Sequence, residues 1–414
     1  MNEQRILHAA LDCISRFKTS KYPLKNAANH LILSRKLNSS ERKLLLNIVF
    51  AWARESYVIA DFLSKELRFF ASMSEQDKDR LASEMLGFRI AHFNANDQII
   101  YLAERYEAYL NQLGDKRYLI ALGEVIKREL VNSFGDQALI IAKGLSEPPK
   151  KWLAFDKTKI QKEELINELK KLGYDVFPHA IAKDALGISK DLNLNMLPMT
   201  LRDQVWFMDA GSQIIASLIR PLPHQRVLDM CAGEGGKARF ITMNPCSYVA
   251  LDIDGNRLKR AKSRLKGKSV QFIEADATKV SFKEKFDWIL LDAPCSGSGV
   301  LRRHPDLIYR LHQKDLDHYH QLQLALLTKA ISLLSSGAHL IYATCSLFAS
   351  ENKQQIDRLL ALNKNLIVQN LDKVLIDGQI ELSTTALNNN SLQLIPHIHD
   401  TDGFFAVSIT KSAE

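Results

Sequence analysis

The chain has 414 residues, of which 46% are hydrophobic and 25% charged, a composition typical of a globular protein large enough for two or three domains. It contains no apolar run long enough to cross a bilayer and no secretory signal after its polar first residues, so we expect a cytoplasmic protein that binds no membrane. Its five cysteines show no Cys-x-x-Cys spacing, which argues against a zinc ribbon or a disulfide framework and predicts free thiols without a metal site.

Positive charge is concentrated in the amino-terminal region. The first fifty residues carry nine lysine and arginine residues against three acidic residues, within a formal net charge of +8 for the whole sequence. A basic region of this kind attracts RNA or DNA, although a solvated helix face can have the same composition.

The first third of the chain has the apolar spacing of helices. From residue 5 to about 143, apolar residues recur three and four positions apart, as at Ile6, Ala10 and Ile14. Asn38 followed by Glu41 predicts a capped helix start, and a later helix is expected over 118–130. We therefore expect an all-helical domain over residues 1–145.

Two consecutive prolines, Pro148 and Pro149, interrupt this pattern. Beyond them the sequence predicts a strand, a helix and a second strand, over residues 151–155, 161–172 and 175–177. This order indicates a small α/β linker domain over residues 146–204.

Residues 205–414 alternate between predicted strands and helices. Strands are expected over 226–230, 248–253, 270–274, 286–291, 339–343 and 403–409, with helices over 257–265 and 322–334 and a surface loop at 388–390. Alternation on this scale predicts an α/β domain in which helices cover both faces of an open, largely parallel, Rossmann-like sheet.

A glycine-rich turn follows the first strand of this domain. Gly233, Gly235 and Gly236 lie between the strand and a helix, where glycine lets the backbone approach a ligand and direct N–H groups at it. Asp252 ends the next strand 19 residues after Gly233, near the offset at which an acidic residue binds a ribose diol. The alternative is a tight turn that binds no ligand.

Further aspartates follow or end strands, at Asp229, Asp276 and Asp292. Ligands of open α/β sheets bind outside the carboxyl ends of the strands, so these residues and Asp252 could line one crevice. One or two could instead cap helices, and Asp229 is the best candidate for a structural role. The sequence lacks both Gly-x-x-x-x-Gly-Lys-Ser/Thr and Gly-x-Gly-x-x-Gly, which argues against ATP and NAD and leaves S-adenosyl-L-methionine as the expected cofactor.

Two cysteines follow predicted strands in short distinctive motifs, Cys295 in Ala-Pro-Cys-Ser and Cys345 in Thr-Cys-Ser. The pair points to chemistry on a pyrimidine, because carbon 5 of cytosine is a poor nucleophile until a thiolate adds to carbon 6. Cys13 and Cys246 are expected to be small buried side chains, and Cys231 a compact residue of the glycine-rich turn.

The two cysteine motifs and the residues around them resemble the RNA cytosine-5 methyltransferases of the NOP/Sun/Fmu family, and among these the methyltransferase B branch, which acts on small-subunit ribosomal RNA. The resemblance is carried by residues 292–299, 302–306, 342–346 and 351–352, and also by 209–213 and 402–405. It implies a class I methyltransferase domain with a mostly parallel seven-stranded sheet over residues 205–414. The helical first third is similar to the NusB-type RNA-binding domain.

The resemblance also implies roles for individual residues. Cys345 is expected to add to carbon 6 of the cytosine, Cys295 to assist release of the enzyme, Asp292 to bind the edge of the base, and Lys237 to reach into the active site. The expected contacts with S-adenosyl-L-methionine are Cys231, Ala232, Gly233, Glu234, Gly235, Gly236, Lys237, Asp252 (ribose), Asp276 (adenine) and Asp292. The expected RNA contacts are Arg302, Arg303 and His304. The implied partner is 16S ribosomal RNA or a small-subunit assembly intermediate, bound by a monomer.

One residue departs from the family pattern. Glu234 stands where members usually carry proline, and its carboxylate could crowd the methionine carboxylate of the cofactor or pair with its amino group.

Three alternatives to the expected function stay open. They are a DNA-type scheme in which Cys295 attacks, a tRNA substrate, and a non-catalytic RNA-binding assembly factor with a degenerate cofactor turn.

Overall fold

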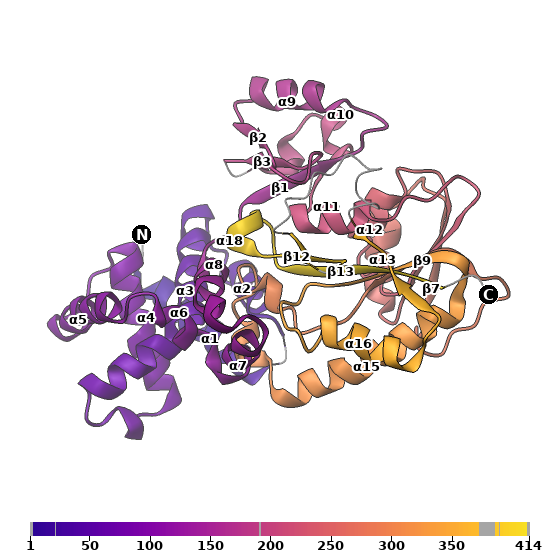
Figure 1. The fold of residues 1–414 in the computed structure, drawn as a ribbon. Coiled ribbons are helices and arrows are strands. Elements are labelled where there is room, and N and C mark those ends of the chain that lie inside the picture. Colours follow the sequence, from indigo (N-terminus) through magenta and orange to yellow (C-terminus); the bar gives the residue numbers. More distant parts are fainter. Residues whose placement is uncertain (1–2, 21, 190–191, 372–385, 389, 412–414) are drawn as a thin grey trace. The chain divides into compact units, whose positions relative to one another are not determined.

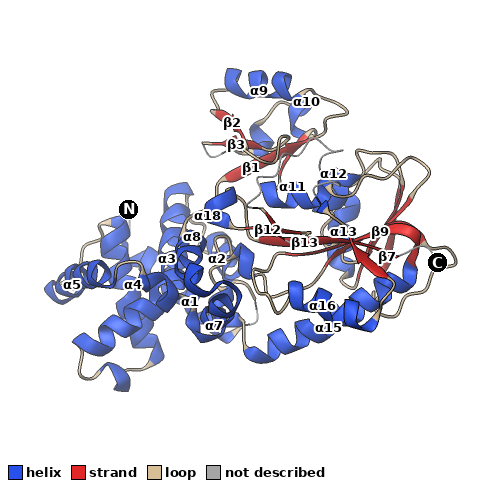
Figure 2. Cartoon of the chain, in the orientation of Figure 1, coloured by secondary structure: helices blue, strands red, loops and turns tan. Residues whose placement is uncertain are grey.

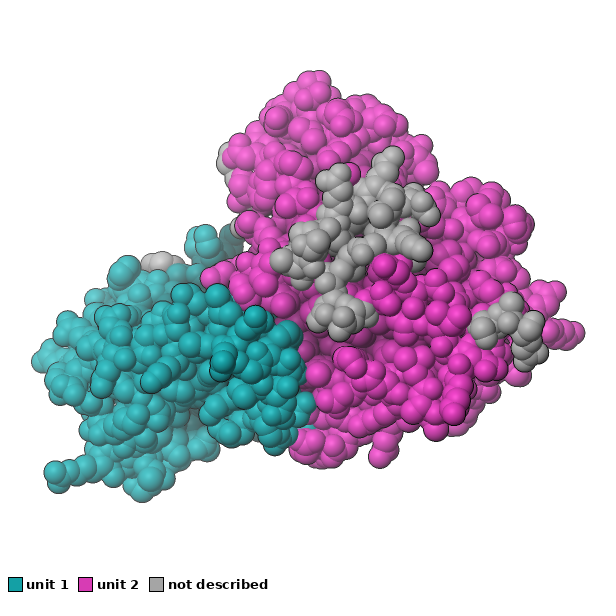
Figure 3. Space-filling view, in the orientation of Figure 1, with its two compact units in different colours: residues 1–146, 303–312 teal, residues 147–302, 313–414 magenta. Residues whose placement is uncertain are grey.

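The computed structural model of the protein describes residues 3–20, 22–189, 192–371, 386–388 and 390–411. The chain divides into two units, Met1–Ser146 with Arg303–His312 and Glu147–Arg302 with Gln313–Glu414 (Figure 3). The first division falls next to the expected boundary at residue 145. The second unit holds the linker and α/β segments together, and residues 303–312 join the helical unit, which the sequence did not predict.

The first unit is all-helical, as expected (Figure 2). Its α-helices are α1 Glu3–Thr19, α2 Leu24–Ser34, α3 Ser39–Glu66, α4 Glu75–Ala91, α5 Asp97–Leu113, α6 Lys116–Ala121, α7 Gly123–Phe134, α8 Ala138–Ser146 and the short α14 Leu307–Arg310. None of the helices in the described parts of the chain is long and apolar enough to cross a membrane.

Local sequence signals explain where these helices begin and end. Asn38 Oδ1 accepts a hydrogen bond from Glu41 N at 3.0 Å, and Glu41 Oε2 accepts one from Asn38 N at 3.0 Å, which confirms the predicted capping box. The single helix predicted over 118–130 is wrong, because the chain breaks into α6 and α7 at Gly123, whose φ of +69° interrupts the helical backbone.

The segment 303–312 packs into the helical unit through an aromatic residue. Tyr309 of α14 stacks on Trp52, with ring centroids 5.0 Å apart, and on Tyr57, with centroids 5.3 Å apart. In addition, Leu24 N donates to Asp306 Oδ2 at 3.3 Å. A segment that lies between Cys295 and Cys345 in sequence therefore packs against the core of the helical unit.

The linker segment forms a four-stranded antiparallel sheet in the order β2-β3-β1-β4. Its elements are β1 Lys151–Phe155, α9 Lys162–Lys171, β2 Val176–Pro178, β3 Leu186–Ile188, α10 Met199–Arg202 and β4 Val205–Phe207. The expected strand, helix, strand order corresponds to β1, α9 and β2. However, β4 lies beyond the expected boundary at residue 204 and belongs to this sheet.

The main sheet of the second unit has the order β11-β12-β13-β9-β8-β5-β6-β7, and β10 pairs with β13. Its strands are β5 Arg226–Asp229, β6 Ser247–Asp252, β7 Val270–Glu274, β8 Phe286–Asp292, β9 Leu334–Thr344, β10 Leu366–Val368, β11 Leu387–Asn388, β12 Ser391–Leu394 and β13 Phe404–Lys411. The five neighbours from β9 to β7 run parallel, and the other described strands pair antiparallel. The sheet is thus Rossmann-like as expected, with nine described strands where seven were expected. The expected loop at 388–390 lies in the β11–β12 hairpin, and Asn389 is outside the described residues.

Helices cover both faces of this sheet (Figure 1). The helices of this part of the chain are α11 Ala210–Ser217, α12 Gly236–Ile241, α13 Gly255–Arg264, α15 Gln313–Leu333, α16 Lys353–Leu362 and the short α18 Pro396–His399, which contributes to neither face. Apolar residues of α11 and α12, such as Ile214 and Ile241, pack on one face, whereas Leu327 of α15 and Leu359 of α16 pack on the other. Burial on both faces accounts for the near-continuous apolar runs of strands such as β8.

Candidate active site

The chemically active residues gather at the carboxyl ends of the parallel strands. β5, β6 and β8 end at Asp229, Asp252 and Asp292, and β9 ends directly before Cys345. Asp292 pairs in register with Ala343 of β9, so the turns that follow β8 and β9 start beside each other. This edge of the sheet is where open α/β folds bind ligands.

The glycine-rich turn after β5 borders open space. Gly233 N donates to Asp252 Oδ2 at 2.8 Å, and Gly233 and Gly235 have φ of +55° and +75°, where other residues are strained. A Cβ atom added at Gly233 or Gly236 would meet nothing within 4 Å, whereas one at Gly235 would lie 3.0 Å from Ala261 Cβ. Gly235 is therefore needed for helix packing, and the other two leave room for a ligand.

Acidic residues stand at the carboxyl ends of the next two strands, Asp252 as the last residue of β6 and Asp276 two residues after β7. Asp252 is buried and accepts hydrogen bonds from Gly233 N and from Asp254 N, which orients its carboxylate. Asp276 accepts hydrogen bonds from Thr278 and lies 3.0 Å from Lys279 Nζ, and these contacts lower the pKa of its carboxyl to about 2. The sequence did not single out Ile253, which is 72% exposed directly after Asp252 and offers an apolar surface there.

Glu234 is directed at α13. Its carboxylate lies 2.8 Å from Arg260 Nε and 2.5 Å from Arg264 Nη2. Partial burial alone would raise the pKa of Glu234, but these two guanidinium groups outweigh it and lower the pKa. The carboxylate that replaces the usual proline is thus neutralised within the protein.

Lys237 and Asp292 form an ion pair beside the glycine-rich turn. Lys237 Nζ lies 2.5 Å from Asp292 Oδ2 and 5.5 Å from the centre of the Phe404 ring. Burial is the largest single effect on Lys237 and lowers its pKa. The charge and hydrogen bond of Asp292, together with the charges of Cys345 and Asp229, outweigh burial, so the net shift of the pKa is upward. The ammonium therefore stays charged. Asp229, by contrast, is buried with Tyr248 Oη 2.9 Å from its Oδ2, and burial raises its pKa to about 7, consistent with a structural residue.

The two cysteines of the distinctive motifs are neighbours. Cys295 Sγ lies 3.4 Å from Cys345 Sγ. The hydrogen bond with Cys345, together with burial, raises the pKa of Cys295 well above its ordinary value, so Cys295 holds its proton in this arrangement. All five cysteines are free, and burial raises the pKa of Cys13 to about 12, in keeping with an inert core residue.

A buried polar network that the sequence did not reveal links the two cysteine motifs. Glu351 is completely buried and accepts hydrogen bonds from Ser296 N at 2.8 Å and from the hydroxyl groups of Ser296 and Ser346. Gln323 Nε2 also donates to Glu351 Oε1 at 3.1 Å. One carboxylate therefore holds the residues that follow both Cys295 and Cys345, and the serine after each cysteine is the sequence signal that could have suggested it.

The three expected RNA-contacting residues have different environments. Arg302 is 4% exposed, donates to Thr401 O at 2.9 Å and lies 3.7 Å from Asp402 Oδ1, a position that does not suit contact with RNA. Arg303 is exposed and His304 half-buried, and both belong to the segment that joins the helical unit.

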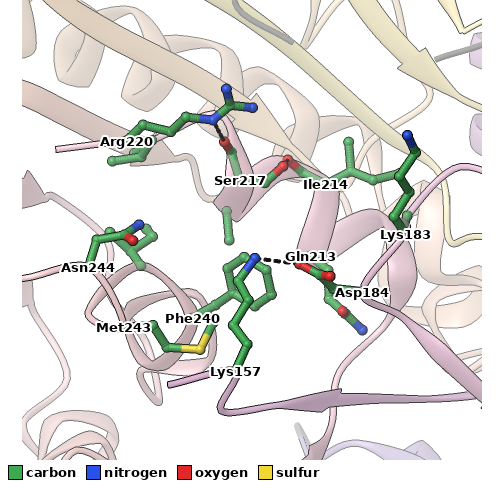
Figure 4. Close-up of a pocket in the computed structure, with 14 residues that line it drawn as sticks. Lys157, Lys183, Asp184, Gln213, Ile214, Ser217, Arg220, Phe240, Met243 and Asn244 are labelled. Carbon is green, nitrogen blue, oxygen red and sulfur yellow. Dashed lines mark hydrogen bonds and ion pairs between the residues drawn. The ribbon is translucent and has the colours of Figure 1, made fainter. Parts of the chain in front are cut away.

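A separate cavity of about 350 Å³ lies between the linker segment and helices α11 and α12 (Figure 4). Lys157, which pairs with Asp184, lines it together with Phe240 and Asn244 near the carboxyl end of α12. The glycine-rich turn precedes the opposite end of α12, so this cavity is distinct from the candidate active site. Within the described ranges, no group of three or more His, Cys, Asp or Glu residues could hold a metal ion.

Comparisons with known proteins place this arrangement in a family. Residues 216–410 match the family model described as 16S rRNA methyltransferase RsmB/F. A relative named ribosomal RNA small subunit methyltransferase B, from Shewanella oneidensis, is 30% identical over 297 residues, which cover 70% of this chain and 67% of the relative. The chain spans about two thirds of the length of the curated relatives that it matches.

Two solved structures show how far the fold extends. The crystal structure titled PH0851 has a TM-score of 0.75 at 21% identity and covers 98% of both chains, so the likeness includes the helical unit as a fold. The structure of NSun6 from Pyrococcus horikoshii with SFG, an S-adenosylmethionine analogue, has a TM-score of 0.58 at 21% identity and covers 69% of this chain and 97% of that one. The sequence matches and the shared methyltransferase fold agree: the chain belongs to the RsmB/F family of 16S ribosomal RNA methyltransferases.

Proposed function

We propose that this protein transfers a methyl group from S-adenosyl-L-methionine to carbon 5 of a cytosine in 16S ribosomal RNA, through a covalent bond between Cys345 and the base. The observation that carries the proposal is the 3.4 Å separation of Cys295 Sγ and Cys345 Sγ, next to the Lys237–Asp292 ion pair. The names of the relatives support small-subunit ribosomal RNA as the substrate.

The glycine-rich turn and its acidic neighbours fit the cofactor. Gly233 and Gly236 border open space, the Asp252 carboxylate is oriented by backbone N–H groups near the place of a ribose diol, and exposed Ile253 suits one face of an adenine. Because Glu234 is paired with two arginines of α13, its charge is neutralised and does not repel the carboxylate of the cofactor. When bound, the cofactor supplies an electrophilic methyl group.

Cys345 is the proposed nucleophile. Its Sγ adds to carbon 6 of a cytosine that has left the base stack, and the electron pair of the C5–C6 double bond makes carbon 5 reactive. The charged Lys237 ammonium interacts electrostatically with Cys345 and is therefore close enough to bind the developing charges of the reaction. Asp292, held by Lys237, accepts a hydrogen bond from the amino edge of the cytosine.

Cys295 is the proposed base for release. Before attack, its proton is held because the hydrogen bond with Cys345 raises its pKa. Once Cys345 Sγ is bonded to carbon 6 it carries no negative charge, so this cause disappears and Cys295 can lose its proton more easily. The Cys295 thiolate then removes the proton from carbon 5, the C5–C6 double bond re-forms, and Cys345 leaves as a thiolate.

The test combines methyl transfer with trapping of the covalent intermediate. Wild type, Cys345→Ala and Cys295→Ala are incubated with labelled cofactor and deproteinised 16S ribosomal RNA, followed by nucleoside analysis and denaturing electrophoresis. We expect labelled 5-methylcytosine with wild type, no transfer with Cys345→Ala, and a protein–RNA band that survives denaturation with Cys295→Ala. Cys246→Ala is the matched control and should behave as wild type.

Other outcomes would identify the alternatives. A trapped band with Cys345→Ala would assign the attack to Cys295, as in the DNA-type scheme. Transfer of the labelled methyl group to tRNA but not to ribosomal RNA would identify tRNA as the substrate. Absence of both cofactor binding and transfer, with assembly intermediates as well as naked RNA, would favour the non-catalytic assembly factor.

A further inference from the structure

The densest run of positive charge in the second unit lies on helix α13 and the turn after it. Between residues 257 and 268 the sequence has seven cations and no acidic residue, namely Arg257, Lys259, Arg260, Lys262, Arg264, Lys266 and Lys268. This run lies outside both the basic first fifty residues and the expected RNA contacts Arg302, Arg303 and His304.

The cations on α13 fall on two different faces. Leu258 and Ala261 are buried against the domain. The Arg260 and Arg264 side chains are four positions apart and both bind Glu234, so their charge is partly neutralised. One face of α13 therefore packs into the hydrophobic core, and a second face binds Glu234 of the glycine-rich turn.

The remaining face carries a row of lysines. Lys259 and Lys262 are three positions apart on α13, and Lys266 follows in the turn, so the three share one side. All three side chains are exposed, and no acidic side chain of the described residues pairs with any of them. Like charges this close repel one another, so the row costs stability unless an anion neutralises it.

The positive surface continues onto the linker segment. Lys268 Nζ lies 3.8 Å from Asp156 Oδ2, and Lys159 Nζ lies 3.7 Å from the same oxygen atom, so two cations share one acidic partner. Helix stabilisation explains only part of this layout. Lys262 and Arg264 lie in the last turn of α13, where cations complement the helix dipole, whereas Lys259 precedes that turn and Lys266 follows the helix.

We propose that Lys259, Lys262 and Lys266 form a docking surface for the phosphate backbone of the substrate RNA, beside the glycine-rich turn. An exposed row of long, flexible cations suits successive phosphates of a strand, because it neutralises charge without reading base identity. The inference rests on the proposed function in that the RNA bound here is the methylation substrate. The surface holds that RNA on the catalytic unit itself.

The test measures the salt dependence of RNA binding by the full-length protein. Wild type, the triple variant Lys259→Gln/Lys262→Gln/Lys266→Gln and a control triple variant are titrated with deproteinised 16S ribosomal RNA at several potassium chloride concentrations. The control changes Lys283, Lys285 and Lys364 to Gln, which removes the same charge from exposed positions elsewhere on the same unit. We call the Lys259→Gln/Lys262→Gln/Lys266→Gln protein the α13 variant. We expect its affinity for the RNA to fall about tenfold or more near physiological salt. The slope of log affinity against log salt concentration should decrease in magnitude by about 2. S-adenosyl-L-methionine affinity should stay within about threefold of wild type, because none of the three lysines belongs to the glycine-rich turn.

The outcomes separate this inference from the proposed function. If wild type forms 5-methylcytosine while the α13 variant keeps the slope and affinity of the control variant, the docking surface is wrong and the function stands. If the α13 variant loses affinity and slope while wild type forms no 5-methylcytosine, the surface binds RNA and the proposed reaction is wrong. Wild type that binds no RNA overturns both.

Discussion

At the scale of single residues, the chemistry depends on where one proton resides. The 3.4 Å contact between Cys295 and Cys345 raises the pKa of Cys295, so Cys295 keeps its proton. The S–H group of Cys295 can therefore serve as a hydrogen-bond donor toward Cys345 Sγ. Cys295 would then act twice, first as a hydrogen-bond donor and later as a base.

This double role can be separated with two variants of Cys295. Cys295→Ser keeps a donor toward Cys345, whereas Cys295→Ala does not, and both lack the thiol needed for release. We expect both variants to trap the RNA adduct, with adduct formation about tenfold slower for Cys295→Ala than for Cys295→Ser, because only the serine keeps a hydrogen bond to Cys345 Sγ. The measurement is the rate of adduct formation in a single turnover. Equal rates would restrict Cys295 to the release step.

Some residues of the candidate site could be predicted because their signal is local. Asp252, Asp292, Cys295 and Cys345 each stand at a strand end in a short motif, and strand ends can be located from apolar runs. The pairing of Glu234 with Arg260 and Arg264 could not be predicted in this way, because the partners lie a helix away and only the packing of α13 brings them together. Arg302 likewise looks like a surface residue in sequence, but packing buries it against Thr401.

At the scale of elements, a single buried carboxylate joins the turns after β8 and β9. Glu351 accepts hydrogen bonds from Ser296 and Ser346, the residues after the two cysteines, and Tyr342 Oη donates to Glu351 O at 2.6 Å. Strand pairing fixes the starting points of both turns, but it does not by itself set the distance between the two thiols. Glu351 is therefore the positioning residue for the cysteine pair.

We expect Glu351→Gln to reduce both stability and methyl transfer. An amide accepts hydrogen bonds on one side only, and a buried hydroxyl or N–H group without a partner costs about 1–3 kcal/mol. Small displacements of the thiols should slow methyl transfer by about tenfold or more, while the affinity for S-adenosyl-L-methionine is retained. Thermal unfolding, cofactor titration and single-turnover rates measure the three quantities.

The matched control is Glu284→Gln in the same unit, where the side chain is 75% exposed and pairs with Arg226. Loss of this exposed ion pair should change the free energy of unfolding by less than about 1 kcal/mol and leave the rate of methyl transfer unchanged. A Glu351→Gln variant with a normal turnover rate would show that strand pairing alone positions the cysteines.

Elements were predictable where the sequence pattern was strong. The apolar runs of β5, β6, β8 and β9 predicted parallel strands, because a strand covered on both faces is continuously hydrophobic. β7 is an edge strand without a fully buried residue and was predicted from its β-branched and aromatic residues. The short strands β10 to β12 were missed, since two to four residues at the side of a sheet carry too little periodicity. The break between α6 and α7 was missed as well, because one glycine within a helical pattern is usually tolerated.

At the scale of the whole molecule, the two units are not consecutive in sequence. Residues 303–312 leave the second unit after Arg302 and complete the first, through Tyr309 against Trp52 and Tyr57. The chain thus passes between the units three times, after residues 146, 302 and 312. The sequence does not predict these crossings. Apolar periodicity identifies an element and its buried face, but not the domain against which that face packs.

We expect Tyr309→Ala to destabilise the helical unit. The substitution removes a ring that stacks on two aromatic partners and leaves a cavity beside Trp52, which should cost roughly 3 kcal/mol. Thermal unfolding followed by circular dichroism and tryptophan emission measures the loss. The control is Tyr22→Ala in the same unit, where the side chain is 69% exposed. Equal stability of the two variants would show that α14 contributes little to the helical core.

The interrupted helical unit also has a consequence for synthesis of the protein. The ribosome completes residues 1–146 well before it adds 303–312, and at about 5–20 residues per second the intervening stretch of about 150 residues takes roughly 8–30 s. During that interval the aromatic surface around Trp52 has no Tyr309 to cover it. The nascent chain therefore exposes an apolar surface that a holding chaperone could bind, and final folding of the first domain must wait for translation of much of the second.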